Sequence, residues 1–215
     1  MKLETETVDF PLRGEWKAIR SPGHHQFAYD FAAVGEDHEQ IFAKSMAALL
    51  LGTATVTDSY SWSEPIYAPI SGRIIQAKDE LPDRQDLNLL KDMARLFVTS
   101  IVPPDDTDER LRAFAGNYVI IGSGNVYTFM AHLQQDSIEV NAGEEVRRGE
   151  PIGLVGNSGS TLGPHLHFQM MDGADPFNTQ IMAFTIRNYE RWTGIEWERM
   201  KFCTPEKGEC IRYAK

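Results

Sequence analysis

The sequence has little of what would place it in several large classes of protein. Only two of its 215 residues are cysteines, Cys203 and Cys210. A cysteine-built zinc module needs closely spaced pairs of cysteines, so these two do not predict one. The longest apolar run covers residues 46–51 and is far too short for a membrane span of about 20 residues. Internal repeats and low-complexity tracts are also missing, which argues against a solenoid or a disordered chain.

An excess of basic residues is missing as well. Lys and Arg number 21 against 31 Asp and Glu, giving a formal net charge of -10. Such a chain repels phosphates, so we expect no nucleic-acid partner. Apolar residues make up 42% of the sequence, enough for a buried core, and the length suits a single domain.

The N-terminal sequence MKLETETVDF lacks the apolar core of a signal peptide. From this we expect a cytoplasmic protein, or a periplasmic or extracellular one if a leader has been removed. Cys203 and Cys210 flank the turn-like sequence TPEKGE. Both a disulfide and two free thiols are compatible with that spacing, and the sequence does not decide between them.

Many short apolar segments separated by glycine-containing turns predict a mainly β fold, an antiparallel β-sandwich or barrel-like core. We expect helices at 39–51 and near 87–98, the second within a charged, proline-containing insertion at 82–115. This insertion is expected to form a mobile loop or lid. The core should cover about 23–171, followed by an irregular tail at 172–215. The expected strands are 26–32, two within 66–77, 118–121, 126–132, 145–146, 152–155 and 165–171.

Histidines and one aspartate suggest where chemistry could occur. His165 and His167 are two residues apart on an expected strand, so both imidazoles point to one face. His132 ends another expected strand, and Asp30 lies in the apolar segment FAYDF. A carboxylate there is costly unless it is paired or coordinated. These residues could form a metal or acid–base site, or could be surface histidines and a hydrogen-bonded buried carboxylate.

Several motifs resemble those of the lysostaphin-type, LytM-like zinc endopeptidases. GNSGSTLGPHLHF, residues 156–168, is similar to the C-terminal signature of that family. MAHL at 130–133, AGEEVRRGEPIGLVGNSG at 142–159 and YAPISG at 67–72 resemble three further family segments. His25 followed by Asp30 resembles the first family motif. The resemblance covers about 23–171, interrupted by the insertion.

This resemblance implies a zinc metalloendopeptidase. Carried over by position, it gives His25, Asp30 and His167 as Zn²⁺ ligands and His132 and His165 as the catalytic pair. Three protein ligands leave a coordination position open for water, as a catalytic zinc requires. The implied substrate is a peptide, in particular the cross-links or stem peptides of peptidoglycan.

The first motif departs from the family pattern. The usual spacing is H-x-x-x-D, whereas His25 and Asp30 are one residue further apart. A β-bulge could absorb the extra residue. His24 is the alternative ligand, since its even separation from Asp30 places both on one face of a straight strand. His38 precedes the expected first helix and is expected to be a surface residue.

Two other classes carry related folds. One is a catalytically inactive LytM-like binding or regulatory module, which typically lacks a ligand that this chain has. The other is the phosphocarrier domain of sugar permeases, which uses paired histidines without obligatory zinc. Asp30 and the GNSGSTLGPHLHF run favour the peptidase over the phosphocarrier. A zinc assay on the purified protein separates the three.

Overall fold

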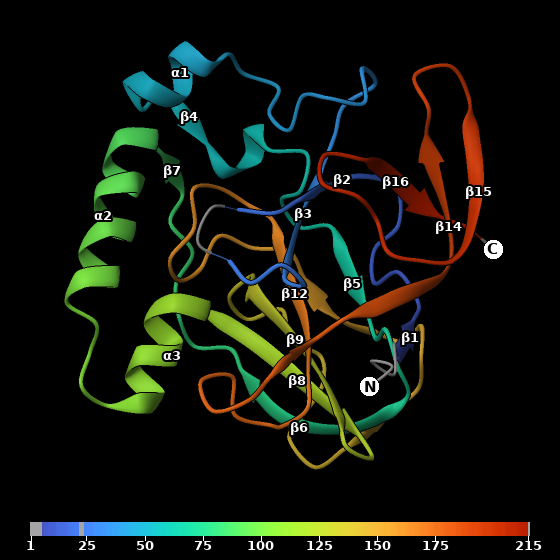
Figure 1. Ribbon diagram of the computed structural model, residues 1–215. Helices are drawn as coiled ribbons and strands as arrows, with labels where there is room; N and C mark the ends of the chain where they lie inside the picture. Colours follow the sequence, from blue (N-terminus) through green and yellow to red (C-terminus); the bar gives the residue numbers. More distant parts are fainter. Residues whose placement is uncertain (1–5, 22–23, 215) are drawn as a thin grey trace.

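The computed structural model describes residues 6–21 and 24–214, and a large β-sheet dominates it (Figure 1). Its twelve strands run in the order β1-β14-β16-β2-β3-β12-β9-β8-β6-β10, with β13 beside β12 and β15 beside β14. All pairs are antiparallel except β1 with β14. The strands are β1 (Glu6–Val8), β2 (Glu15–Ile19), β3 (Tyr29–Ala33), β6 (Gly72–Lys78), β8 (Asn117–Ser123), β9 (Val126–Leu133), β10 (Glu145–Val146), β12 (Leu166–Met171), β13 (Ile181–Met182), β14 (Phe184–Trp192), β15 (Trp197–Cys203) and β16 (Cys210–Tyr213).

The mainly β prediction is confirmed, with an open sheet in place of a barrel. Among the described residues the two end strands, β1 and β10, pair with β14 and β6 and not with each other. Two further pairs complete the β structure: β5 (Pro65–Tyr67) with β11 (Pro151–Leu154), and β4 (Ala54–Thr55) with β7 (Asp86–Leu87). The short 3₁₀ helix η1 (Val56–Asp58) follows β4.

The strand that carries Asp30 is buried on both faces. All five residues of β3 are buried, because this strand lies in the interior of the sheet and is covered on both faces. Phe31 makes an edge contact with Phe10 and stacks on Tyr29 at 5.7 Å between ring centroids. Asp30 points to the opposite face of the strand from these rings and is only 4% exposed.

The expected first helix is shorter than its sequence pattern. α1 (Met46–Leu51) begins after Ser45, whose side chain accepts a hydrogen bond from the backbone of Ala48. It ends at Gly52, which has a φ of 69°. Residues 39–45 form turns and a bridge between Phe42 and Ser59 instead.

The insertion at 82–115 contains two helices where one was expected. They are α2 (Leu89–Ile101) and α3 (Thr107–Ala115), capped by Asn88 and Asp106. Both lie to one side of the sheet (Figure 1). Leu111 and Ala115 belong to a buried apolar cluster that includes residues of β8 and β9. The C-terminal end of the insertion is therefore part of the core and not a detachable lid.

The N-terminal end of the insertion is anchored equally firmly. Asp83 accepts hydrogen bonds from the backbone nitrogens of Gln135 and Asn157 at 2.7 and 2.5 Å. Leu87 is buried in a small cluster with Ala54. Among the described residues of the insertion, the exposed large apolar side chains lie along the whole of α2, from Leu90 to Val102.

The expected irregular tail is the clearest error of the sequence-based prediction. Residues 181–213 form four strands, and β14, β15 and β16 extend the main sheet. Phe184, Ile186 and Tyr189 of β14 are buried in the main core. β16 pairs with β2, with Ile211 opposite Trp16. The core therefore extends well beyond residue 171.

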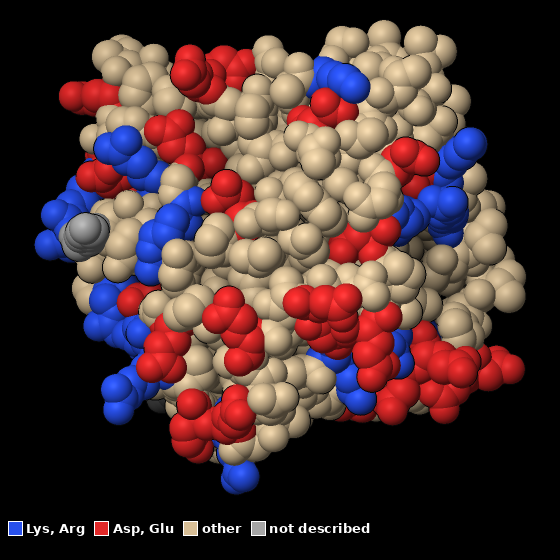
Figure 2. All heavy atoms as spheres, turned by 180° about the vertical axis from the view of Figure 1, so that it is seen from behind, with Lys and Arg blue, Asp and Glu red and all other residues tan. Residues whose placement is uncertain are grey.

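The two cysteine side chains are free thiols in this fold. Cys210 is buried, and burial raises the pKa of its thiol to about 12. No helix in the described part of the chain is long and apolar enough to cross a membrane. Acidic side chains are spread over much of the face shown in Figure 2, as the net charge leads one to expect.

Candidate metal and catalytic site

Three neighbouring strands place the site. In the register of the sheet, His167 of β12 lies opposite Asp30 of β3 and, on its other side, opposite Ala131 of β9. His132 follows Ala131, and His165 immediately precedes β12. Directly opposed residues on adjacent strands have neighbouring side chains. The pairing of β3, β12 and β9 therefore gathers residues that are more than 130 positions apart in the sequence.

His24, Asp30 and His167 form a compact group of metal-ligand side chains. Asp30 Oδ1 lies 2.9 Å from His167 Nδ1, and Asp30 Oδ2 lies 3.3 Å from His24 Nδ1. One ligand atom from each residue lies within 4.8 Å of the other two. Two imidazoles and a carboxylate suit zinc, so the donor set fits the ion that the motifs imply.

The structure places His24 in this group and not His25, the ligand expected from the motif spacing. His25 is exposed, and its Nδ1 accepts a hydrogen bond from the backbone nitrogen of Phe27 at 3.3 Å. The physical reason is the turn that precedes β3, closed by a hydrogen bond from Ala28 N to His25 O. Because the strand begins only at Tyr29, counting residues along an extended chain does not give the orientation of the two histidines.

Asp30 is a buried carboxylate surrounded by polar partners. Burial alone would raise its pKa, but hydrogen bonds and charge from His165, His167 and His24 outweigh burial and hold the pKa well below its usual range. The hydroxyl of Ser21 also donates to Asp30 Oδ2 at 2.5 Å. Three imidazoles and a hydroxyl thus offset the cost of burying this charge.

His132 is a buried imidazole with a defined tautomer. Its Nδ1 lies 3.0 Å from the carbonyl oxygen of Ser158, which can only accept, so Nδ1 carries the proton and Nε2 has a free lone pair. Burial, with the neighbouring His165 and His167, lowers its pKa well below the usual value. Its φ of 65° lies in the left-handed region, an unusual conformation that concentrates at functional sites.

The ring of His165 is also oriented through its Nδ1, but its pKa is shifted in the opposite direction. Its Nδ1 donates to the carbonyl oxygen of Gly163 at 2.8 Å, and Thr161 Oγ1 lies 3.2 Å away. Burial would lower its pKa, but the charge of Asp30, 3.5 Å from His165 Nε2, raises it on balance. The rings of His132 and His165 lie 4.7 Å apart, so an imidazole that favours the neutral form faces one that favours the charged form.

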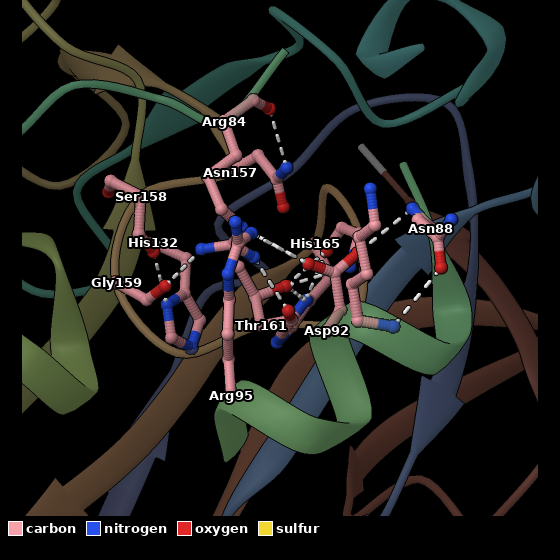
Figure 3. Close-up of polar contacts among 12 residues, drawn as sticks. Arg84, Asn88, Asp92, Arg95, His132, Asn157, Ser158, Gly159, Thr161 and His165 are labelled. Atoms are coloured by element: carbon pink, nitrogen blue, oxygen red, sulfur yellow. Dashed lines mark hydrogen bonds and ion pairs between the residues drawn. The ribbon is translucent and has the colours of Figure 1, made fainter. Parts of the chain in front are cut away.

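Several supporting residues are absent from the sequence-based prediction. Gln169 Oε1 lies 3.1 Å from His167 Nε2, and its position two residues further along the strand could have revealed it. Ser158 is fully buried and accepts a hydrogen bond from Asn117 N at 2.9 Å. Figure 3 shows Ser158 and Thr161 beside the two histidines that they support. Ser21 has no sequence signal, because its contact depends on how the chain enters β3.

A cavity lies away from the candidate site. Its volume is about 720 Å³, and none of the candidate-site residues lines it. Glu15 lines it and lies 2.8 Å from Nδ1 of the half-buried His38, whose ring packs against Trp192 at 4.3 Å. His38 is therefore braced in the fold and not a free surface residue. Cys210 completes a second group of potential ligand atoms, but the Glu15 carboxylate is already shared with Arg212.

Comparison with known proteins is consistent with the motifs. Residues 105–179 match peptidase family M23. Peptidoglycan DD-endopeptidase ShyA of Vibrio cholerae is 44% identical over 69 residues, 32% of this chain and 16% of that protein. The DD-carboxypeptidase/endopeptidase Mpg of Neisseria meningitidis is 44% identical over 69 residues, 32% of this chain and 15% of that protein. The matched part thus spans about a sixth of the length of these relatives.

A solved structure of lysostaphin from Staphylococcus simulans aligns with 77% of this chain and 47% of its own, with 17% identity and a TM-score of 0.44. The lysostaphin-type resemblance of the motifs is confirmed by the family match, which includes His132, His165 and His167. The match to peptidase family M23 covers about a third of this chain, from just before α3 to just before β13.

Proposed function

We propose that this protein is a zinc-dependent endopeptidase that hydrolyses peptide bonds in the cross-links or stem peptides of peptidoglycan. The observation that carries the proposal is the grouping of His24, Asp30 and His167 with ligand atoms within 4.8 Å of one another, beside the further imidazoles His132 and His165. The relatives named as peptidoglycan endopeptidases support the substrate class.

His24, Asp30 and His167 would hold the zinc ion. When bound, zinc polarises the scissile carbonyl and lowers the pKa of a coordinated water to about 7. With three protein ligands the ion keeps a position open, which distinguishes hydrolytic from structural zinc sites. Gln169 and Ser21 hold the His167 ring and the Asp30 carboxylate in place, and such outer partners fix ligand orientation.

His132 would act as the general base. Its protonated Nδ1 is fixed by Ser158, so the lone pair on Nε2 is available to accept a proton. Its lowered pKa keeps the ring neutral at pH 7, which a base requires.

His165 would provide the complementary function. The charge of Asp30 raises the pKa of the His165 imidazole. The Nδ1 of His165 is held by the carbonyl oxygen of Gly163. A charged imidazole can stabilise a developing oxyanion and donate a proton to the leaving amine. The rings of His132 and His165 lie 4.7 Å apart, so a base and an acid could act on the same peptide bond.

The test is a zinc analysis combined with a digest of purified peptidoglycan. We expect about one zinc per chain and release of cross-linked peptides by the wild-type protein. His132→Ala should retain zinc and lose most of the hydrolysis. Zinc without hydrolysis in the wild type would instead support an inactive binding or regulatory module. Absence of zinc would overturn the ligand assignment.

A further inference from the structure

Two arginines of the insertion share one buried carboxylate. Asp92 is 2% exposed, and its Oδ1 lies 3.3 Å from Arg84 Nε and 3.2 Å from Arg95 Nη1. Its Oδ2 accepts a hydrogen bond from the backbone nitrogen of Asn88 at 3.1 Å. Two guanidinium groups therefore lie together here, with Asp92 and, beside Arg84, Asp83 as the opposite charges. This is notable in a protein with a formal net charge of -10.

The two arginines differ in how many hydrogen-bond donors their contacts within the described residues leave available. Arg84 is 22% exposed, and its guanidinium donates to the carbonyl oxygens of Gly159 and Thr161, the second at 2.7 Å. Arg95 is 59% exposed and makes a single contact, through Nη1 to Asp92. Its other nitrogens have no partner among residues 6–21 and 24–214. The guanidinium of Arg84 is therefore occupied by contacts within the protein, whereas that of Arg95 can bind a ligand.

Both arginines line a cavity of about 150 Å³ between α2, α3 and the turn at 159–161. Figure 3 shows the arginines on one side of this turn and the rings of His132 and His165 close by. Thr161 lines the cavity and also contacts His165 Nδ1 at 3.2 Å. The cavity thus shares a wall with the proposed catalytic pair.

The size and charge of the cavity define what it can hold. Pockets for drug-sized ligands occupy about 300–1,000 Å³, so a cavity of about 150 Å³ suits one small group at the end of a side chain or peptide. Arginine recognises planar carboxylates through its forked nitrogens. Asp92 is also paired with Arg84 and accepts a hydrogen bond from Asn88 N, so Arg95 is not its only partner.

We propose that this cavity is a subsite for a carboxylate of the substrate peptide, and that Arg95 forms the ion pair with it. The inference rests on the proposed function, because the carboxylate belongs to the peptide that the catalytic histidines would act on. It goes beyond that function by naming a specificity-determining residue outside the metal site.

The experiment compares two forms of one cross-linked peptidoglycan stem peptide, with its side-chain carboxylates free or converted to carboxamides. Wild type, Arg95→Gln, Arg95→Lys and the control Lys91→Gln are assayed with both. Lys91 is an exposed cation on the same helix and makes no side-chain contact in the described structure, so its variant matches the change in net charge.

We expect wild type and Lys91→Gln to prefer the free carboxylate. Arg95→Gln should lower kcat/KM for that peptide roughly 10- to 100-fold, mainly through KM, as loss of a charged hydrogen bond implies. The carboxamide peptide should be unaffected, and Arg95→Lys should recover part of the preference. Equal losses on both peptides, or no preference in the wild type, would overturn the subsite.

Calorimetric binding of the same peptides separates failure of the subsite from failure of the proposed function, since it needs no turnover. Carboxylate-dependent binding that disappears in Arg95→Gln, without hydrolysis by the wild type, would refute the endopeptidase and support the subsite. Hydrolysis by the wild type, with identical binding of both peptides, would support the endopeptidase and refute the subsite.

Discussion

Replacing His24 and His25 separately by alanine tests the metal site at its most specific point. The structure places His24 Nδ1 3.3 Å from Asp30 and the His24 ring 5.1 Å from the His167 ring. His25 points instead toward Phe27. We expect His24→Ala to lose tight zinc binding, because only two ligands remain, and His25→Ala to retain it.

The magnitude follows from linkage between binding and folding. At free zinc a thousandfold above Kd, binding adds about 4.1 kcal/mol to the free energy of unfolding. For a chain of this length that corresponds to a rise in Tm of about 8–16 °C over the chelated protein. Loss of a ligand should weaken binding by more than the 10–100-fold that outer partners cost. A thousandfold loss would leave about 0.4 kcal/mol, or a rise of 1–2 °C.

Differential scanning calorimetry with zinc and with a chelator, together with metal analysis, measures this directly. His24→Ala should melt at nearly the same temperature in both conditions, while His25→Ala should follow the wild type. The reverse result would restore the assignment made from motif spacing. Equal loss in both variants would mean that the two histidines act together, and an unchanged shift in both would remove this segment from the site.

Three further outcomes follow from single side chains. Ser158→Ala leaves the buried backbone nitrogen of Asn117 without its acceptor and should cost about 1–3 kcal/mol in urea unfolding. Ser160→Ala, whose hydroxyl makes no contact in the described structure, should stay within about 0.5 kcal/mol of wild type, and equal costs would contradict the argument. His132→Ala should lower peptide hydrolysis by about 10²–10⁴-fold with zinc content unchanged, and loss of zinc would make it a ligand. Burial raises the pKa of Glu64, so its contribution to the free energy of unfolding is present at low pH and is lost as pH rises through the folded-state pKa. Glu64→Gln should therefore gain stability relative to wild type between pH 4 and pH 8. A difference in stability that does not change with pH would refute this.

The parts of the fold that depend on local pattern were predictable. The glycine-rich approach to β12 and the His165–His167 pair lie together in the sequence, and the observed strand begins within one residue of its expected start. Asp30 was singled out because a carboxylate within an apolar strand needs a partner. The structure supplies four partners, among them Ser21 and His24.

The errors share a physical cause, since each depends on contacts between distant segments. His24 and His25 cannot be separated by spacing, because a backbone turn and not a strand precedes β3. The C-terminal strands were missed because alternation of buried and partly buried residues in β14 breaks at Arg187 and Asn188. Its partners β1 and β16 stabilise it nonetheless.

One of the two strands that flank the Asp30 strand is synthesised much later. β3 pairs with β12, and His167 lies 137 residues after Asp30. At synthesis rates of about 5–20 residues per second, the two sides of the site appear about 7–27 s apart. β2 is the other neighbour of β3, and its own second partner, β16, is synthesised later still.

A nascent chain therefore carries Asp30 for many seconds with neither its imidazole partners on β12 nor the sheet that buries it. During that interval the carboxylate is solvated, and the proposed site is incomplete. The proposed site therefore stays incomplete until β12 has been synthesised and has paired with β3, because His167 follows Asp30 by 137 residues.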